Sequence, residues 1–322
     1  MLQIAIVGAG KLGGRHLQGL GNIQHLCEIH LVDPFAESLA SAKARFEVIP
    51  ANFNIVGLRG HAGISSLPQI LDLVILATTS DVRLAAMRSL LRHSEVRFML
   101  LEKVLFPEVS DYDEAAELLE RSSVRAWVNC SRRLFDVYIN AREEFLTDRL
   151  IHMDVTGGTW GLGCNGIHFL DLMAFLTGEM PNHFNISGLS PGSIPAKRGG
   201  FLEFSGTIAA ATSAAVISLT AHEFSSARHL VTLRGEELSY VIDESAGRYW
   251  KMVRDGTWTT GEFQVPFQSQ MTGNVANRLF SAGECGLPRF EESSKVHQPF
   301  LAALIRHLGF DQTHGSTTCL IT

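Results

Sequence analysis

The stretch Ile4-Ala-Ile-Val-Gly-Ala-Gly-Lys-Leu-Gly-Gly-Arg-His16 decides the fold of the first part of the chain. Its β-branched residues predict a buried parallel strand, and the glycines that follow form a G-x-G-x-x-G turn that leads into a helix. In such a turn the first glycine permits the tight bend, the second lets the backbone approach a pyrophosphate, and the third lets helix and strand pack closely. The free N–H groups of the helix start attract anions, so the stretch predicts a dinucleotide site. The residues expected to line it are Gly8, Gly10, Lys11, Leu12 and Gly13.

The next apolar run supports this interpretation and bears on the cofactor. Ile29-His-Leu-Val-Asp33 ends in a carboxylate twenty positions after Gly13, where it can accept hydrogen bonds from an adenosine ribose. A carboxylate there repels a 2'-phosphate, and the three residues that follow supply no cation. The sequence therefore favours NAD over NADP.

Composition places the chain among ordinary globular proteins. Its 322 residues suit two domains, and 46% of them are hydrophobic while 19% are charged. The net charge of -6 argues against nucleic acid or an anionic membrane as a partner, and no apolar run is long enough to span a bilayer. The five cysteines lie far apart in the sequence, which favours neither a disulfide framework nor a zinc site, so we expect no metal. The first strand begins within four residues of the N-terminus and leaves no room for a signal peptide, so we expect a cytoplasmic protein.

Strand and helix patterns alternate over residues 2–130, which predicts a doubly wound parallel sheet. We therefore expect a dinucleotide-binding domain over residues 1–130. Residues 47–63 show no clear pattern. The expected helices are 36–46, 82–92 and 111–122, and the expected later strands are 72–78, 97–103 and 124–130.

Two strand ends in this domain carry polar residues. The run 72–78 ends in Thr78, Thr79 and Ser80, at the sheet edge where ligands of open α/β folds bind, although helix capping alone is an alternative. The run 97–103 ends in Glu102 and Lys103, an expensive pair of charges for a buried strand. An amine beside a cofactor can exchange a proton with a substrate hydroxyl, and the alternative is a solvated strand end. We expect these residues to contact the cofactor.

After residue 130 the pattern changes, which predicts a second, α+β domain over residues 131–322. A helix over 135–146 is followed by strand-like runs at 150–162, 201–207, 214–221, 229–234 and 238–242. Hairpin signals at Arg234-Gly-Glu-Glu and Arg254-Asp-Gly-Thr favour one broad, mostly antiparallel sheet. Small apolar residues at 208–215 favour pairing of this sheet with a second copy, so we expect a homo-oligomer.

One helix is expected within that sheet domain, over residues 164–177 with Gly178 as its C-cap. His168 and Asp171 share a face of its first turns, where the acid can orient a histidine that exchanges protons. The alternative is a hydrogen-bonded structural histidine.

The glycine turn, the Glu102-Lys103 strand end and the segment Gly166-Ile-His-Phe-Leu-Asp-Leu together resemble the glucose-fructose oxidoreductase/inositol dehydrogenase (Gfo/Idh/MocA) family. The resemblance covers nearly the whole chain, and its C-terminal half is similar to members associated with surface-polysaccharide sugars. It implies a nucleotide-binding domain followed by an open-faced sheet that holds substrate against the nicotinamide. It also implies hydride transfer to or from a secondary hydroxyl or ketone of a sugar, polyol or nucleotide-sugar, with Lys103 and His168 as catalytic residues.

The chain departs from the family pattern at three positions. Val104 stands where a proline usually follows the lysine, Arg83 stands where a histidine is common, and Cys164 stands where an aspartate often precedes the histidine. We expect Cys164 to be a packing residue and Asn165 to contact a substrate hydroxyl.

Polar residues just after the sixth strand are also candidates for substrate binding. Asn129, Arg132 and Arg133 are placed to contact sugar or phosphate, with surface salt bridges as the alternative for the two arginines. Two other function classes stay open. One is a redox-assisted lyase or hydrolase with recycled NAD, and the other is a non-catalytic NAD-binding sensor or scaffold.

Overall fold

The computed structural model describes residues 1–309 and 317–322 and divides into two compact units. The first unit comprises Met1–Phe106, Ser110–Asn129 and Pro266–Phe290, and the second comprises Pro107–Val109, Cys130–Val265 and Glu291–Thr322. The predicted division falls within one residue of the break at Asn129. It is wrong for Pro266–Phe290, which returns to the first unit.

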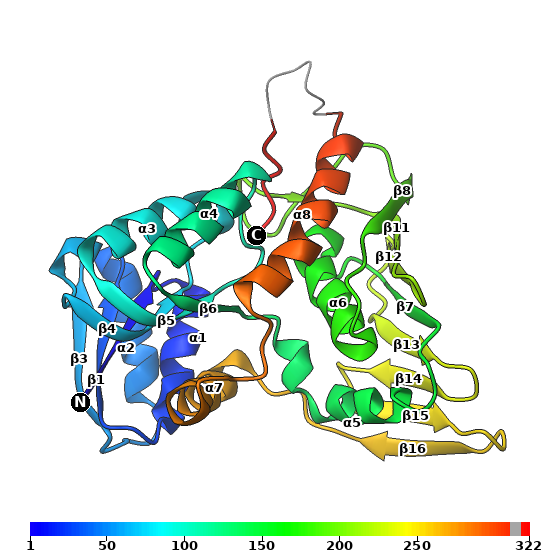
Figure 1. Ribbon diagram of the computed structural model, residues 1–322, viewed down its shortest axis with the longest axis horizontal. Helices are drawn as coiled ribbons and strands as arrows, with labels where there is room; N and C mark the ends of the chain where they lie inside the picture. The colour runs from blue at the N-terminus through cyan, green and yellow to red at the C-terminus, as the bar shows by residue number, and fades with distance from the viewer. Residues whose placement is uncertain (310–316) are drawn as a thin grey trace. The chain divides into compact units, whose positions relative to one another are not determined.

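The first unit is built on a six-stranded sheet with the order β3-β2-β1-β4-β5-β6, and every neighbouring pair is parallel. Figure 1 shows α3 and α4 on one face of this sheet and α1, α2 and α7 on the other. The doubly wound sheet is therefore confirmed. Its strands are β1 Leu2–Val7, β2 Cys27–Val32, β3 Ile55–His61, β4 Ile70–Leu76, β5 Glu95–Leu101 and β6 Arg125–Val128. Its helices are α1 Lys11–Gly19, α2 Ala36–Glu47, α3 Ser80–His93, α4 Ser110–Arg121 and α7 Gln268–Ala282.

The strand β3 lies in the segment for which the sequence gives no clear pattern. It is an edge strand that pairs only with β2, none of its residues is fully buried, and it contains Gly57 and Gly60. An edge strand exposed on both faces has no apolar alternation to reveal it.

The helix α7 explains why a late segment belongs to the first unit. It packs against α1, and the contact depends on small residues. A Cβ on Gly19 would lie 2.8 Å from the side chain of Thr272, and a Cβ on Gly273 would lie 2.6 Å from the carbonyl oxygen of Gly19. The two helices therefore approach closely because both carry glycine at the contact.

The second unit contains an eight-stranded sheet with the order β16-β15-β14-β13-β7-β12-β11-β8. Only β7 and β12 are parallel, so the predicted mostly antiparallel sheet and both hairpins are confirmed. The strands are β7 His152–Gly157, β8 His183–Leu189, β11 Gly206–Ala211, β12 Val216–Ala221, β13 Leu230–Arg234, β14 Ser239–Asp243, β15 Arg248–Met252 and β16 Trp258–Glu262. The short strands β9 Ile194–Pro195 and β10 Leu202–Glu203 form a separate pair.

The helices of this second part are α5 Asp136–Phe145, α6 Leu162–Thr177 and α8 Phe290–His307. α6 packs on β12 and on α5, and it ends at Gly178, which has φ of 75° as the predicted C-cap requires. Within the described residues 152–262, α6 is the one helix between the strands of this sheet, so the predicted single helix is confirmed. The sequence did not predict α7 and α8, which follow the last strand. The run 150–162 is only partly strand, because the chain turns at Gly161 (φ 84°) and enters α6.

One face of the second sheet is less covered than the other. On β11 and β12 the side chains of Ile208, Ile217 and Leu219 are buried, whereas their neighbours in the sequence are partly exposed. Pairing of this face with a second copy stays a prediction. No helix in the part of the chain that the structure describes has both the length and the apolar character of a membrane span.

Candidate functional site

The glycine turn has the geometry that the sequence predicts. Gly8 has φ of 97°, and a Cβ on Gly13 would lie 1.8 Å from the carbonyl oxygen of Gly8. Gly10 is the N-cap of α1, no side chain caps that helix, and a Cβ on Gly10 would meet nothing within 4 Å. Two glycines are therefore required by packing, and the third faces open space at the start of a helix whose N–H groups attract anions.

Asp33 closes the same edge of the sheet. It follows β2 and is buried, and its Oδ2 accepts a hydrogen bond from the N–H of Ala9 at 2.7 Å. Its Oδ1 accepts another from the N–H of Phe35 at 2.9 Å. The carboxylate is thus fixed beside the glycine turn by two neutral backbone donors, and each oxygen retains acceptor capacity.

The end of β4 contributes hydroxyl groups next to this turn. Within the described residues, the Oγ1 of Thr78 is buried and has no hydrogen-bond partner. Thr79 is the N-cap of α3 but makes no side-chain capping bond, and Ser80 begins the helix. A buried hydroxyl without a partner is costly, so capping alone does not account for these residues.

These features of the first unit fit a dinucleotide. The open space at Gly10 and the uncapped start of α1 suit a pyrophosphate, and Asp33 at the end of the neighbouring strand suits a ribose. Lys11 and Leu12 occupy the first turn of α1. The first unit therefore contains a complete set of residues that could hold such a cofactor.

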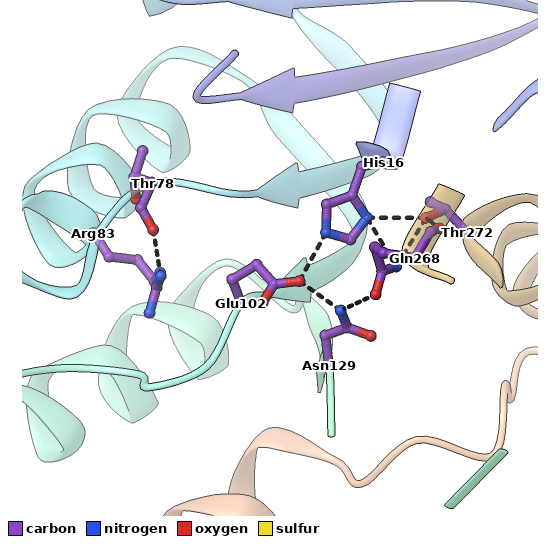
Figure 2. A network of polar contacts seen from close by, with 7 residues as sticks. All are labelled: His16, Thr78, Arg83, Glu102, Asn129, Gln268 and Thr272. Atoms are coloured by element: carbon purple, nitrogen blue, oxygen red, sulfur yellow. Dashed lines mark hydrogen bonds and ion pairs between the residues drawn. The ribbon is translucent and has the colours of Figure 1, made fainter. Parts of the chain in front are cut away.

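A buried polar network surrounds Glu102, which follows β5 and is 3% exposed (Figure 2). The Nε2 of His16 donates to its Oε1 at 2.7 Å, and the Nδ2 of Asn129 donates to the same oxygen. Asn129 also donates to Gln268 at 2.8 Å, and Thr272 lies 3.0 Å from the other nitrogen of His16. Burial acts to raise the pKa of Glu102, but the hydrogen bonds from His16 and Asn129 and the electrostatic interactions with His16 and Lys103 hold that pKa below its usual value. The carboxylate is therefore ionised and links α1, β5, β6 and α7.

Sequence reasoning placed Glu102 and Asn129 in the site but missed their partners on α1 and α7. His16 carried a signal, because it lies three residues after Gly13 and three before Gly19, on the glycine face of α1. A polar residue on such a closely packed face needs a buried partner. Gln268 and Thr272 could not be placed in this network from the sequence, because the helix α7 was not predicted.

Lys103 follows Glu102 and is half-buried, whereas every other residue from Phe98 to Pro107 is buried. It is therefore the one side chain of this segment that reaches solvent in the first unit. Its predicted partner, His168, lies in the second unit on α6 and is also half-buried.

Asp171 was expected to orient His168, and the structure gives it a different partner. The Nε and Nη2 of Arg133 each donate to one oxygen of Asp171 at 2.8 Å, and Asp171 is 1% exposed. Arg133 also pairs with Glu292 at 2.6 Å. The bidentate pair ties α6 to the 3-10 helix Ser131–Leu134, and the pair with Glu292 ties that 3-10 helix to α8. Both pairs have a structural role.

Arg132 is likewise engaged within the second unit. It forms a bidentate pair with Glu244 at 2.8 and 2.7 Å, and its guanidinium lies 4.1 Å from the ring centre of Phe169. Glu244 also accepts a hydrogen bond from Tyr138 at 2.7 Å. These contacts favour the salt-bridge alternative for Arg132, and contact with substrate stays a prediction.

The start of α6 is held by a residue that sequence reasoning missed. Glu203, on β10, accepts hydrogen bonds from the N–H groups of Gly163 at 2.7 Å and Cys164 at 3.1 Å. A carboxylate at a helix N-terminus stabilises the helix through its dipole. Asn165 donates to the carbonyl oxygen of Trp160 at 2.8 Å, so its amide is used in part to hold the preceding turn.

Comparison with known proteins places both units in one fold. No protein-family model and no curated protein sequence matches the chain. Among the solved structures that match over 96% of the chain are two oxidoreductases and one regulator. UDP-N-acetylglucosamine 3-dehydrogenase GnnA from Acidithiobacillus ferrooxidans has 14% identity, 97% of its own chain covered and a TM-score of 0.72. An oxidoreductase from Agrobacterium radiobacter in complex with NAD+, L-tartaric acid and magnesium has 16% identity, 96% covered and a TM-score of 0.70.

The third structure is a regulator. The transcriptional regulator Gal80p from Kluyveromyces lactis has 13% identity, 90% of its own chain covered and a TM-score of 0.75. At these identities the matches establish fold and nothing further. The chain therefore has the fold of Gfo/Idh/MocA-type NAD-binding oxidoreductases, and the resemblance seen in its sequence is confirmed at the level of fold.

Proposed function

We propose that the chain is a nicotinamide-dependent oxidoreductase that transfers a hydride to or from a secondary hydroxyl or ketone of a sugar, polyol or nucleotide-sugar. The observation that carries the proposal is the edge of the first sheet. There the glycine turn, Asp33, Thr78 and Lys103 all follow the carboxyl ends of parallel strands, where open α/β sheets bind their ligands.

The proposed roles follow from the contacts of each residue. When bound, the nicotinamide supplies the hydride chemistry. Gly10 and the start of α1 bind the pyrophosphate, and Asp33 accepts hydrogen bonds from the ribose. The carboxylate favours NAD over NADP, because it repels a 2'-phosphate.

Lys103 and His168 are assigned the proton transfer to or from the reacting hydroxyl. The lysine amine polarises or deprotonates the reacting hydroxyl, and the imidazole of His168 assists the proton movement. This assignment requires the two units to bring both side chains to one nicotinamide ring. The solved structure named as a UDP-N-acetylglucosamine 3-dehydrogenase, which has the same fold, supports the choice of substrate class.

A second function, a non-catalytic NAD-responsive sensor, is favoured by one observation. Cys164 stands where an aspartate often precedes the histidine, and the carboxylate of Glu203, on β10, is used to cap the N–H groups of Gly163 and Cys164. A transcriptional regulator with the same fold supports this alternative. Tight NAD binding without turnover would be its signature.

The first experiment tests cofactor binding with Gly10→Ala and its matched control Gly63→Ala. Neither added methyl group meets an atom closer than 4.0 Å, and neither glycine has a positive φ, so both variants should fold normally. We expect NADH affinity, measured by fluorescence titration, to fall roughly 100-fold in Gly10→Ala and to stay unchanged in Gly63→Ala, because only the first methyl group occupies the pyrophosphate position. Equal affinity in the two variants would contradict the proposed site.

The second experiment tests the chemistry. A panel of free and nucleotide-linked sugars is followed at the NADH absorbance band with the natural protein, Lys103→Ala and the control Lys197→Ala, whose lysine is exposed in a loop of the second unit. We expect turnover by the natural protein and the control, and loss of at least about 100-fold in kcat in Lys103→Ala with NADH affinity retained. Full activity in Lys103→Ala would reject the catalytic assignment, and binding without turnover over the whole panel would support the sensor.

A further inference from the structure

We propose that Arg83 is a positioning residue for Lys103, whose guanidinium holds the two backbone carbonyls that follow the lysine. The inference rests on the proposed function, since it takes Lys103 as the proton-exchanging group. It assigns a role to a buried cation that the proposed function does not otherwise use.

Arg83 is 1% exposed and lies in the first turn of α3. Its Nη1 donates hydrogen bonds to the carbonyl oxygens of Val104 and Leu105, the second at 2.8 Å. Its Nη2 donates to the carbonyl oxygen of Thr78 (Figure 2). One side chain therefore joins the segment after β5 to the segment after β4.

The physical chemistry of arginine makes this contact specific. A buried cation loses its hydration, and the loss is tolerated only where several acceptors replace the water. The guanidinium carries its donors in a rigid, planar fork, so it can bind two successive carbonyls and a third from another loop at fixed angles. A lysine amine is a single point of charge and cannot reproduce this geometry.

The segment that carries Lys103 is thereby held on both sides. Before the lysine, the carboxylate of Glu102 is fixed by His16 and Asn129. After it, the carbonyls of the next two residues are fixed by Arg83. The lysine itself is the half-buried residue between these two fixed points, so its direction depends on both.

Two of the positions that depart from the family pattern are in contact in the structure. Val104 replaces a proline that helps to hold the lysine, and Arg83 replaces a common histidine. The structure joins these two positions by a hydrogen bond, from the side chain of Arg83 to the carbonyl of Val104. Arg83 therefore supplies a backbone support for the lysine in a segment that lacks the proline.

The test compares Arg83→Met with Arg88→Met, a control on the same helix whose surface pair with Glu114 is about 40% exposed on both sides. Activity is measured with the best sugar from the panel. We expect Arg83→Met to lower kcat roughly 10- to 100-fold, the size of effect that a small misplacement of a reacting group produces, with KM and NADH affinity changed less than about threefold. Arg88→Met should match the natural protein.

A second variant and a second readout keep the test decisive. Arg83→Lys retains the buried charge without the fork and should recover only part of kcat, even where Arg83→Met folds poorly. The rate at which a small acylating reagent labels Lys103, measured by mass spectrometry, should change in both variants. The rate at Lys43, a half-buried lysine on α2 of the same unit, should not change.

The outcomes separate the two proposals. Natural kcat and natural labelling of Lys103 in the Arg83 variants, with Lys103→Ala inactive, would overturn the positioning role and leave the proposed function intact. Full activity in Lys103→Ala would overturn the proposed function, and with it the catalytic purpose of Arg83. Loss of NADH affinity equal to the loss of kcat would also overturn the inference, because it would mean that the whole sheet edge has been disturbed.

Discussion

The two units bury their carboxylates in different ways. In the first unit, Asp33 is held by backbone N–H groups and Glu102 by an imidazole and an amide. In the second unit, Asp171 and Glu244 are each held by a bidentate guanidinium, from Arg133 and Arg132. All four carboxylates are at most 9% exposed.

The difference separates acids paired with a guanidinium from acids that lie where we propose that a cofactor binds. A guanidinium donates charge-assisted bonds to both oxygens of its partner. Asp171 thereby fixes α6 to the 3-10 helix Ser131–Leu134, and Glu244 fixes that 3-10 helix to the end of β14. Few acceptor positions of these two carboxylates are left for a substrate. The backbone and amide donors of the first unit fix their acids in place with weaker bonds. Those acids lie at the sheet edge where the cofactor is proposed to bind.

The largest expected effect is at Arg133. Arg133→Met leaves Asp171 and Glu292 close together without their cation, and breaking a buried ion pair in this way destabilises a protein by about 3–5 kcal/mol. The control Arg149→Met removes a surface pair with Glu236 in the same unit, in which both partners are more than half exposed, and should cost less than about 1 kcal/mol. Urea unfolding of the two variants checks this. Similar losses of unfolding free energy in the two variants would contradict the distinction between the buried and the surface ion pair.

The ionisation of Glu244 should make the free energy of unfolding fall with pH in the acid range. Burial acts to raise its pKa, but the charge of Arg132 and hydrogen bonds from His229, Arg132 and Tyr138 lower the pKa to about 2, from 4.5. The ionised form is therefore favoured in the folded state. Its contribution, about 3 kcal/mol, is complete above pH 4.5 and is lost as the pH falls toward 2.

The measurement compares the unfolding free energies of the natural protein and Glu244→Gln from pH 6 to pH 3. The difference should narrow as the pH falls below 4.5. A difference that stays constant over this range would contradict the assigned ion pair.

Glu102→Gln should have a smaller effect on stability than Arg133→Met. The variant keeps an oxygen that can accept from Asn129 but loses the charge that favours the bond from His16, so we expect a loss of about 1–3 kcal/mol. Glu114→Gln, at an exposed pair of the same unit, is the control and should change stability by less than about 1 kcal/mol. A loss of stability as large as that of Arg133→Met would show that the imidazole and amide donors of the first unit do not differ in this respect from the guanidinium donors of the second.

The smallest effect is expected at Asp33 and concerns cofactor choice. Asp33→Asn keeps an acceptor but removes the charge that repels a 2'-phosphate, so the preference for NADH over NADPH should fall roughly tenfold. Asp72→Asn is the control, because Asp72 also accepts a backbone N–H, from Gln3 at 2.8 Å, but lies near the start of β4. Titration of both cofactors checks the ratio, and an unchanged preference in Asp33→Asn would remove the assigned role.

The fold was predictable from the sequence where a local pattern of residues is enough to predict a strand or a helix. The apolar runs of β1, β4 and β5 and the glycine turn specify a parallel sheet without further information. β3 was not predictable because it is an exposed edge strand. α7 was not, because its packing depends on contacts between Gly19 and Gly273, more than two hundred residues apart in the sequence.

The site was predictable in its positions and less so in its partners. Gly8 and Gly13 have the packing roles that their spacing indicates, and Asp33 lies at the strand end beside the turn, while its contact with a ribose stays a prediction. The partner of Asp171 was missed because Arg133 lies 38 positions away, whereas His168 is one turn away and looked like the natural neighbour. The spacing of residues in the sequence shows which of them share a helix face. It does not show which side chain from a distant part of the sequence pairs with that face.

The central claim is that Lys103 and His168 act on one nicotinamide ring bound at the glycine turn. A crystal structure of the protein with NADH tests it most directly. We predict that the pyrophosphate lies against the start of α1 and that both side chains contact the nicotinamide. A cofactor bound elsewhere, or a nicotinamide that contacts neither Lys103 nor His168, would contradict the account.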